Sequence, residues 1–280
     1  MGGRRPHRCA RATSVSEALK KIAEGREAEL FLLPDGRVLR LVRPGMPRAE
    51  ERIRLEAAAL AAAVEAGAPA PRVYETVVRD GRPGLIMERL EEPDLLTLLG
   101  RRPWLVLNIA RRTAELHAEL HRVDAPAALP RLKEWIRAHL EESDVVPEDL
   151  HREALSLLDE LPDGDRLCHG DFHPGNIMVG GERPAVVDWT SATRGDPAGD
   201  VARTWVLLEA SPVPPGAPAL LRRLVGIGRG VLLHGYARAY LRRSMIDADR
   251  LSRWTQLRAI ERLAQDVPGE RERLLTLLGR

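Results

Sequence analysis

Hydrophobic residues in the first third of the chain fall in short runs separated by tight turns. The runs at 28–33 and 37–43 flank a Pro-Asp-Gly turn, and the runs at 72–78 and 84–90 flank an Asp-Gly pair. Short extended runs around such turns are typical of β-hairpins. The pattern therefore predicts four strands in a small antiparallel sheet.

Two helices are predicted in the same region. Residues 48–66 are rich in strong helix formers, and Gly67 follows directly as a stop signal. A shorter helix is predicted to begin at the capping box formed by Ser14 and Glu17 and to end at Gly25. The sheet is therefore expected to be accompanied by one long helix.

From Leu95 onward the hydrophobic residues recur mainly at helical spacing. This spacing predicts helices over the segments 105–123, 131–142, 150–161, 201–210, 218–243 and 249–278. The Gly- and Pro-rich stretch 162–200 interrupts them and contains two short apolar runs, at 176–179 and 185–187.

A sheet-rich beginning followed by a helical remainder predicts an α+β fold with two lobes. The N-lobe, with the sheet and the long helix, is expected at residues 1–88. The C-lobe, with the polar stretch and most of the helices, is expected at residues 89–280.

The composition narrows the classes of partner. A net charge of +2 favours neither nucleic acid nor an anionic membrane. Two cysteines, Cys9 and Cys168, make neither a disulfide framework nor a C-x-x-C zinc pattern. No run approaches about 20 apolar residues, and the basic N-terminus is not followed by an apolar stretch. We therefore expect a cytoplasmic monomer or homodimer that binds neither nucleic acid nor membrane.

Chemically versatile side chains are concentrated in residues 167–190, LCHGDFHPGNIMVGGERPAVVDWT. Asp171 and Asn176 are separated by four residues, and Asp188 directly follows the second apolar run. ATP-dependent phosphoryl transfer needs a carboxylate where the acceptor hydroxyl presents its proton. It also needs an amide oxygen and a second carboxylate that hold Mg²⁺ against the phosphates. The spacing therefore predicts a site where MgATP and an alcohol meet.

The motifs HGDFHPGN and VVDW resemble those of the aminoglycoside phosphotransferase and choline kinase-like family, which shares the protein-kinase fold. The resemblance covers residues 24–203 and, more loosely, the helices that follow. It implies that Asp171 is the catalytic base and that Asn176 and Asp188 bind Mg²⁺. The phosphoryl donor would be ATP, with GTP as the alternative. The acceptor would be a hydroxyl of an aminoglycoside-like antibiotic or of a small amino alcohol or sugar.

Two further segments extend the resemblance. GLIMERLEE resembles the hinge between the lobes, where the backbone of Glu88 and Leu90 would meet the adenine edge and Met87 would line the pocket. GDPAGDVA resembles the segment whose second acid, Asp200, braces the catalytic loop from below. His169 would hold that loop in place.

His173 would support the same turn of the loop. On the nucleotide side, RLEAAALAAAV resembles the small-lobe helix, with Glu56 at the position that pairs with a phosphate-binding lysine. RVLRLVR, however, has Arg40 where the family has lysine. Residues two apart share a face of a strand, so Val38 would cover the adenine while Arg40 reaches the α- and β-phosphates. Arginine is longer and planar, so the replacement is not conservative.

Two alternative functions remain open from the sequence. His169, Asp171 and His173 occupy alternate positions and could bind the metal of a hydrolase. The arginine in place of lysine could mark a nucleotide-binding pseudokinase without turnover. His117 and His121, one helical turn apart, have zinc-like spacing, but a partly buried amphipathic face is the preferred interpretation because no third ligand lies nearby in the sequence.

Overall fold

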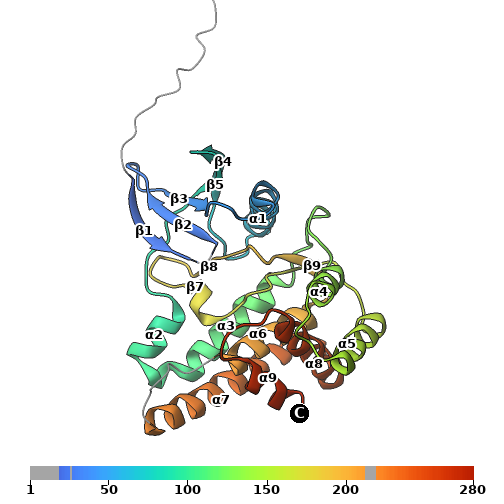
Figure 1. The fold of residues 1–280 in the computed structure, drawn as a ribbon. Helices are drawn as coiled ribbons and strands as arrows, with labels where there is room; N and C mark the ends of the chain where they lie inside the picture. Colours follow the sequence, from blue (N-terminus) through green and yellow to red (C-terminus); the bar gives the residue numbers. More distant parts are fainter. Residues whose placement is uncertain (1–18, 26, 212–218) are drawn as a thin grey trace, which may run out of the picture.

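The computed structural model describes residues 19–25, 27–211 and 219–280. Its first part is a five-stranded antiparallel sheet with the strand order β1-β2-β3-β5-β4 (Figure 1). The strands are β1 Lys20–Glu24, β2 Ala28–Leu32, β3 Val38–Val42, β4 Val73–Arg79 and β5 Arg82–Met87. Helix α1, Ala49–Glu65, packs against β4 and β5. Both predicted hairpins and the predicted long helix are confirmed.

The central strand β3 is buried along its whole length. It pairs with β2 on one side and with β5 on the other, so that Arg40 lies between Leu30 and Leu85. A Cβ atom on Gly84 of β5 would stand 2.5 Å from the carbonyl oxygen of Arg40. Only glycine allows this close approach of two backbones. The sheet therefore holds Arg40 in a fixed register.

The prediction of a short helix ending at Gly25 is wrong for residues 19–25, the part of it that the structure describes. Residues 20–24 form β1, which pairs with β2 at the edge of the sheet, while Ser14 and Glu17 lie outside the described residues. All five residues of β1 are exposed. An exposed edge strand is held mainly by main-chain hydrogen bonds, so its side chains carry little signal of its structure.

The rest of the described chain is mainly helical. Its helices are α2 Leu95–Arg101, α3 Val106–Leu120, α4 Leu132–Glu141, α5 Glu148–Glu160, α6 Pro197–Ala210, α7 Ala219–Leu241, α8 Ala248–Ala264 and α9 Arg271–Leu277. The single helix predicted over 249–278 is in fact α8 and α9, separated by a turn. α8 ends at Ala264, and Asp266 and Gly269 then have φ values of 45° and 80°. Pro268 lacks the N–H that a helix needs, so the helix cannot continue into α9.

Two pairs of short strands shape the stretch between α5 and α6. β6, Arg166–Cys168, pairs with β9, Thr193–Gly195, and β7, Ile177–Met178, pairs with β8, Ala185–Val186. The predicted apolar runs correspond to β7 and β8, whereas β6 and β9 were not predicted as strands. The sheet and the helical part agree in kind with the two expected lobes; the boundary after residue 88 stays a prediction.

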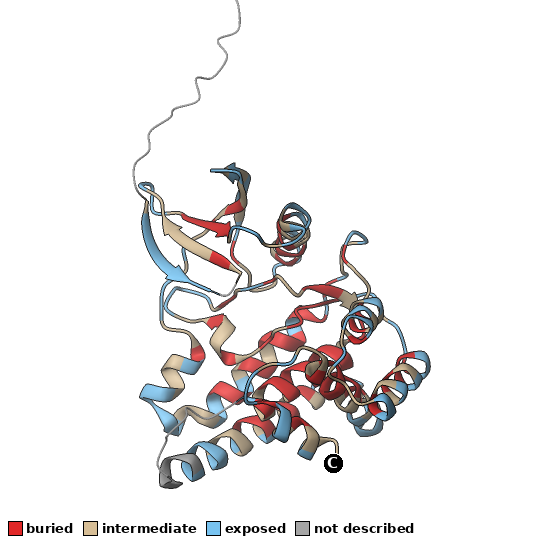
Figure 2. Cartoon of the chain, viewed as in Figure 1, coloured by how far each residue is buried: buried red, intermediate tan, exposed pale blue. Residues whose placement is uncertain are grey.

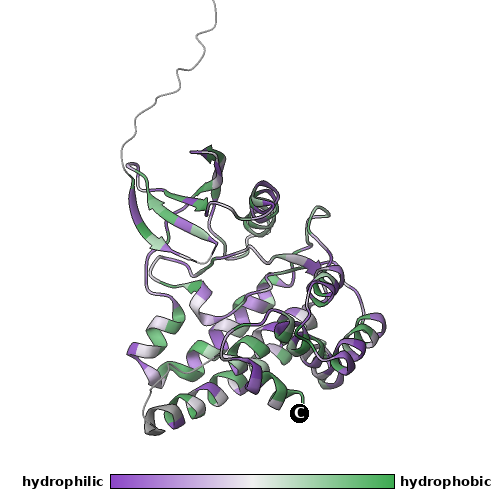
Figure 3. Cartoon of the chain, viewed as in Figure 1, coloured by the Kyte–Doolittle hydropathy of each residue, from purple (hydrophilic) through white to green (hydrophobic). Residues whose placement is uncertain are grey.

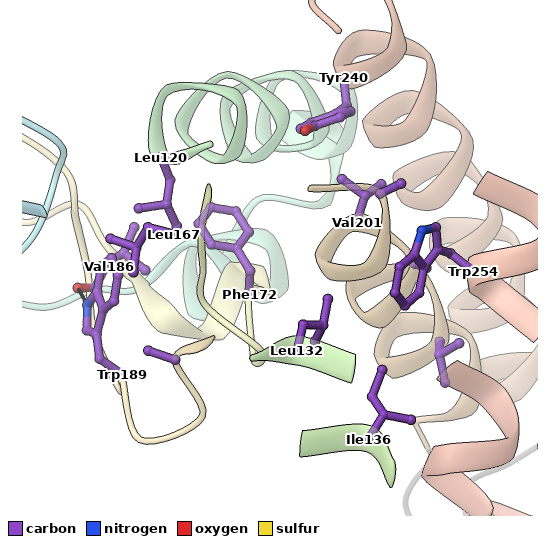
Figure 4. Close-up of a cluster of buried hydrophobic side chains, with 14 of the residues drawn as sticks. Leu120, Leu132, Ile136, Leu167, Phe172, Val186, Trp189, Val201, Tyr240 and Trp254 are labelled. Carbon is purple, nitrogen blue, oxygen red and sulfur yellow. Dashed lines mark hydrogen bonds between the residues drawn. The ribbon is translucent and has the colours of Figure 1, made fainter. Parts of the chain in front are cut away.

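The largest group of buried side chains lies in the helical part. Leu167, Phe172, Trp189 and Val201 gather there and are essentially inaccessible (Figure 4). Buried residues concentrate on the inward faces of the helices (Figure 2), and those faces carry mainly apolar residues (Figure 3). Burial of these apolar side chains supplies the largest favourable part of the free energy of folding. Since Phe172 belongs to the polar stretch itself, the core anchors that stretch directly.

None of the helices in the described ranges combines the length and the apolar content needed to cross a membrane.

Candidate active site

A tight loop carries the polar motif from β6 to β7. Gly170 has a φ of 79°, and a Cβ atom there would lie 2.3 Å from the carbonyl oxygen of Ser191. Both the backbone conformation and the lack of space exclude a larger residue. After this turn the loop places Asp171 at a partly exposed position, with a third of its side chain accessible. Glycine is therefore required where the chain turns to present the acid.

Asn176 is bonded directly to Asp171. Its Nδ2 donates to the backbone carbonyl of Asp171 at 2.9 Å and to the carboxylate Oδ2 at 3.0 Å. Because the NH₂ group of the amide is turned toward Asp171, its oxygen remains for another partner. The two predicted site residues thus form one unit, with the acid on one side and a free amide oxygen on the other.

Backbone pairing brings Asp188 to the same place. Val187 donates its N–H to the carbonyl of Asn176 at 2.9 Å, next to the paired strands β7 and β8. Asp188 then adopts a φ of 65°, in the left-handed region, with half of its side chain exposed. Such strained non-glycine residues cluster at functional sites. The structure therefore brings Asp171, Asn176 and the backbone beside Asp188 together.

A third charged group, Arg40, connects the sheet to this cluster. Its Nη1 lies 2.9 Å from Oε2 of Glu56 on α1, and its Nη2 lies 4.0 Å from Oδ1 of Asp188. Arg40 and Glu56 are both buried. Burial raises the pKa of Glu56 to about 7, although the arginine opposes the shift. The predicted replacement for lysine thus pairs with the predicted glutamate and points toward the polar loop.

The residues expected around the adenine lie at the end of the same sheet. Val38 and Met87 are directly opposite each other on β3 and β5, and both are buried. The N–H of Glu88 donates to the carbonyl of Arg72 at 2.9 Å. Within the described ranges, the Glu88 carbonyl and the Leu90 N–H make no protein hydrogen bond. These two groups remain for a ligand edge.

Asp200 lies at the centre of a buried network beneath the loop. Its carboxylate accepts the backbone N–H groups of His169, at 2.6 Å, and Gly170, at 2.8 Å. It is fully buried, yet hydrogen bonds from two imidazoles outweigh desolvation and hold its pKa well below the usual range. Those imidazoles belong to His117 and His121, whose Nε2 atoms lie 3.0 and 3.2 Å from Oδ2.

Two tyrosines complete this network from α7. Tyr236 Oη lies 2.7 Å from Nδ1 of His117, and Tyr240 Oη lies 2.6 Å from Nδ1 of His121. Burial and the neighbouring imidazole lower the pKa of His117 to about 3, so this ring is neutral. A neutral ring that donates from Nε2 accepts at Nδ1, which makes the tyrosine hydroxyl the donor.

Both histidines are therefore buried, His117 completely, and are not on the partly buried face that the sequence favoured. With Asp200 they have the residue types and the spacing of a metal site, because one possible ligand atom from each lies within 4.8 Å of the others. Each imidazole nitrogen, however, already has a hydrogen-bond partner. The matching i, i+4 spacing of Tyr236 and Tyr240 on a second helix was a signal in the sequence, but only the fold brings the two pairs together.

His169 ties the loop to the strand beside Asp188. Its Nδ1 accepts the N–H of Asp171 at 3.2 Å, and its Nε2 lies 3.1 Å from the carbonyl of Val187. Burial lowers its pKa, which favours this neutral, donor-and-acceptor form. Both ring nitrogens are thus used by the backbone. This arrangement does not fit the hydrolase alternative, in which His169 would bind a metal.

His173 acts on the other side of Asp171. Its Nδ1 accepts the N–H of Gly175 at 3.0 Å, while its Nε2 lies 3.7 Å from Oδ2 of Asp171. Desolvation opposes ionisation of Asp171, but interactions with His173, and with the more distant His169 and Arg203, lower its pKa to about 2. The carboxylate is therefore ionised at neutral pH.

Arg203 is a neighbour of the loop that the sequence analysis missed. It is buried, and its Nε donates to the carbonyl of Gly170 at 3.3 Å. Its Nη1 lies 3.3 Å from Glu261 on α8, so the loop is linked to the C-terminal helices. Arginines are frequent along this chain, and no local pattern distinguishes this one.

The chain is similar to known proteins in both sequence and fold. The model of the phosphotransferase enzyme family matches residues 18–250. None of the curated proteins matches the sequence. Among solved structures, an amicoumacin kinase in complex with AMP-PNP, Ca²⁺ and Ami superimposes with a TM-score of 0.62 at 14% identity, over 95% of this chain and 88% of that one.

Two other similar structures come from different kinases. A choline/ethanolamine kinase family protein from Mesorhizobium loti gives a TM-score of 0.61 at 19% identity, over 96% of this chain and 88% of that one. An aminoglycoside-3′-phosphotransferase of type VIII gives 0.58 at 20% identity, over 85% and 90%. At such identities the likeness concerns the fold alone, and it confirms the predicted α+β, two-lobe, protein-kinase-like architecture.

Proposed function

Because the chain belongs to the phosphotransferase enzyme family, we propose that it transfers the γ-phosphoryl group of ATP to a hydroxyl of a small molecule in a Mg²⁺-dependent reaction. The observation that carries this proposal is that Asp171, Asn176 and the backbone beside Asp188 lie at one place. Asn176 is bonded to Asp171, and its backbone is bonded to the residue before Asp188.

Asp171 is proposed to orient the acceptor hydroxyl and to receive its proton. A carboxylate with a pKa of about 2 is a weak base, so positioning is its larger contribution. Phosphoryl transfer suits such a group, since its transition state is loose and depends mostly on positioning and charge. His173 would keep the carboxylate ionised, and Asn176 would keep it aimed, through the 3.0 Å hydrogen bond to Oδ2.

The donor set fits a magnesium ion. The oxygen of the Asn176 amide, left over by its bonds to Asp171, and the half-exposed carboxylate of Asp188 are the hard oxygen ligands that Mg²⁺ prefers. When bound, the ion would neutralise charge on the phosphate oxygens. The left-handed backbone at Asp188 would help to place its carboxylate beside the Asn176 amide.

The nucleotide is proposed to lie between β3 and the polar loop. Arg40 would donate to the phosphates, and Glu56 would hold the guanidinium in place. The Glu88 carbonyl and the Leu90 N–H would pair with the edge of the base, and the apolar side chains of Val38 and Met87 would pack against its face. We take ATP as the donor, and a parallel titration with GTP tests that choice.

The acceptor is proposed to be a small polar alcohol. The similar structures include an amicoumacin kinase, an aminoglycoside phosphotransferase and a choline/ethanolamine kinase family protein. Their substrates are properties of those proteins, and they guide only the choice of compounds to test. An ATP-consumption screen over amino sugars, amino alcohols and macrolides tests the proposal. Consumption of ATP that requires both Mg²⁺ and one of these acceptors supports it, whereas no acceptor-dependent consumption in any class contradicts it.

Arg40→Ala is expected to weaken MgATP binding by about tenfold or more, because a charge-assisted hydrogen bond to phosphate is lost. Isothermal titration measures the dissociation constant. Arg37→Ala is the matched control, since Arg37 begins the same segment but pairs with Asp35 at an exposed turn. An unchanged MgATP affinity in Arg40→Ala would refute the phosphate-binding role.

A further inference from the structure

A cavity lies on the helical part, outside the proposed active site. Its volume is about 310 Å³, and it is bounded by the C-terminal ends of α3 and α7 and by the start of α6. Four arginines line it: Arg122, Arg166, Arg243 and Arg250. They come from separate parts of the chain, so the fold assembles this positive surface.

Asp196 is the one acidic residue among those that line the cavity. Arg250 neutralises it, with Nη2 and Nε at 2.6 and 2.9 Å from its two oxygens. The carboxylate also accepts the indole N–H of Trp254 at 2.8 Å and the N–H of Ala198 at 2.9 Å, where it caps α6. With four donors around it, Asp196 contributes little repulsion toward an entering anion.

The other three arginines are weakly neutralised. Arg166 pairs with the exposed Asp124 at 2.6 Å, and Arg243 pairs with Glu115 at 2.7 Å; neither acid lines the cavity. Exposed ion pairs of this kind are weak and are easily exchanged for another anion. Arg122 has no carboxylate within 4.0 Å in the ranges that the structure describes. A ligand thus meets an excess of positive charge.

The charge of the cavity favours a phosphate group. Several guanidinium groups suit a phosphate group, which has three terminal oxygens and up to two charges, better than a single carboxylate. Ser244 also lines the cavity, but its Oγ is buried.

Hydrogen bonds connect the floor of the cavity to the catalytic loop. His121 and Tyr240 line the cavity, and they are bonded to each other at 2.6 Å. His121 is bonded in turn to Asp200, which holds the backbone N–H groups of His169 and Gly170. A ligand that restrains this floor therefore acts on the same hydrogen bonds that hold the loop.

We propose that this cavity is an effector site for a phosphate group, free or as a monoester, and that its occupancy steadies the catalytic loop through His121 and Asp200. The arginines provide the charge, and His121 and Tyr240 provide the connection to the loop. Binding at this site requires neither nucleotide nor transfer.

Titration of the full-length protein with inorganic phosphate, at constant ionic strength, tests the site. Saturable binding is expected, and Arg122→Gln is expected to weaken it about tenfold, the effect of one charge-assisted hydrogen bond. Arg152→Gln is the matched control, since it removes the same charge from an exposed position on α5. Arg40→Ala shows whether phosphate binds in the proposed nucleotide site, and equal binding in this variant is expected.

Hydrogen–deuterium exchange of the segment 167–172 tests the connection. Phosphate is expected to slow exchange there in the unchanged protein but not in Arg122→Gln. O-phosphoethanolamine in place of phosphate distinguishes the two sources, since tighter binding of either compound assigns the natural ligand to its class.

Three results would overturn the proposal: no saturable binding, equal binding in Arg122→Gln, or binding that leaves the exchange of this segment unchanged. Neither readout uses phosphoryl transfer, so failure here is distinct from failure of the proposed function.

Discussion

Asp171→Asn is expected to lower the rate of phosphoryl transfer by about 10²- to 10⁴-fold, the range that a positioned acid–base group contributes. Affinity for MgATP is expected to stay within about threefold of the unchanged protein, since Asp171 is assigned to the acceptor and not to the metal. The replacement keeps the shape of the side chain and an oxygen that accepts the Asn176 amide. Steady-state kinetics with an acceptor from the screen, together with nucleotide titration, provide the two quantities.

Asp80→Asn is the matched control for this experiment. Asp80 is exposed at a turn of the sheet and has a φ of 52°, which asparagine tolerates. This replacement should leave the rate of phosphoryl transfer and the affinity for MgATP unchanged. Turnover close to normal in Asp171→Asn would remove the assignment of Asp171 as the catalytic base.

Asp200→Ala is expected to destabilise the fold by about 3–5 kcal/mol, the usual cost of removing one partner from a buried charged network. The loss leaves four donors without an acceptor: two backbone N–H groups of the loop and the imidazoles of His117 and His121. Urea denaturation measures the free energy of unfolding. Asp249→Ala, at an exposed position in the first turn of α8, is the control and should cost a few tenths of a kcal/mol.

If Asp200→Ala does not fold, Asp200→Asn is the variant on which turnover can be measured. Asparagine retains one acceptor oxygen but presents an NH₂ group where donors already point, so the loop should be displaced. Turnover should fall while the acceptor-free nucleotide affinity changes less. Free energies of unfolding within about 1 kcal/mol of the unchanged protein in both variants would show that Asp200 does not brace the loop.

The structure also indicates how the contribution of Asp200 varies with pH. A carboxylate whose pKa is depressed on folding stabilises the protein above its unfolded pKa, and this contribution is lost as the pH falls toward the folded value. The pKa of Asp200 lies well below 3.8. The Asp200 contribution should therefore be fully present at neutral pH and decline progressively as the pH falls below 3.8.

Local patterns were sufficient for most of the fold. The hairpin of β2 and β3 has its turn and both strands in one continuous stretch, and α1 ends at a glycine, so each is encoded within a few residues. β1 is different, because its strand form depends on pairing with β2 and not on its own side chains. The break between α8 and α9 was missed although Pro268 and Gly269 were visible in the sequence.

The candidate site divides in the same way. Asp171, Asn176 and Asp188 lie within 18 positions of one another, so their spacing alone suggested one site. The pair of Arg40 and Glu56 was suggested by resemblance, and the structure forms this pair, with Arg40 4.0 Å from Asp188. The network around Asp200 joins residues about 80 positions apart, and the tyrosines are 119 positions from their histidines. Only the packing of α3 against α7 and α6 could bring these groups together.

The most direct test of the central claim is a crystal structure with Mg²⁺ and a non-hydrolysable ATP analogue. We expect the ion to be bound by the side-chain oxygens of Asn176 and Asp188 at about 2.1 Å. Arg40 should contact the phosphates, and the γ-phosphate should face Asp171. An ion bound instead by His117, His121 and Asp200, or a nucleotide bound away from Arg40, would contradict the account.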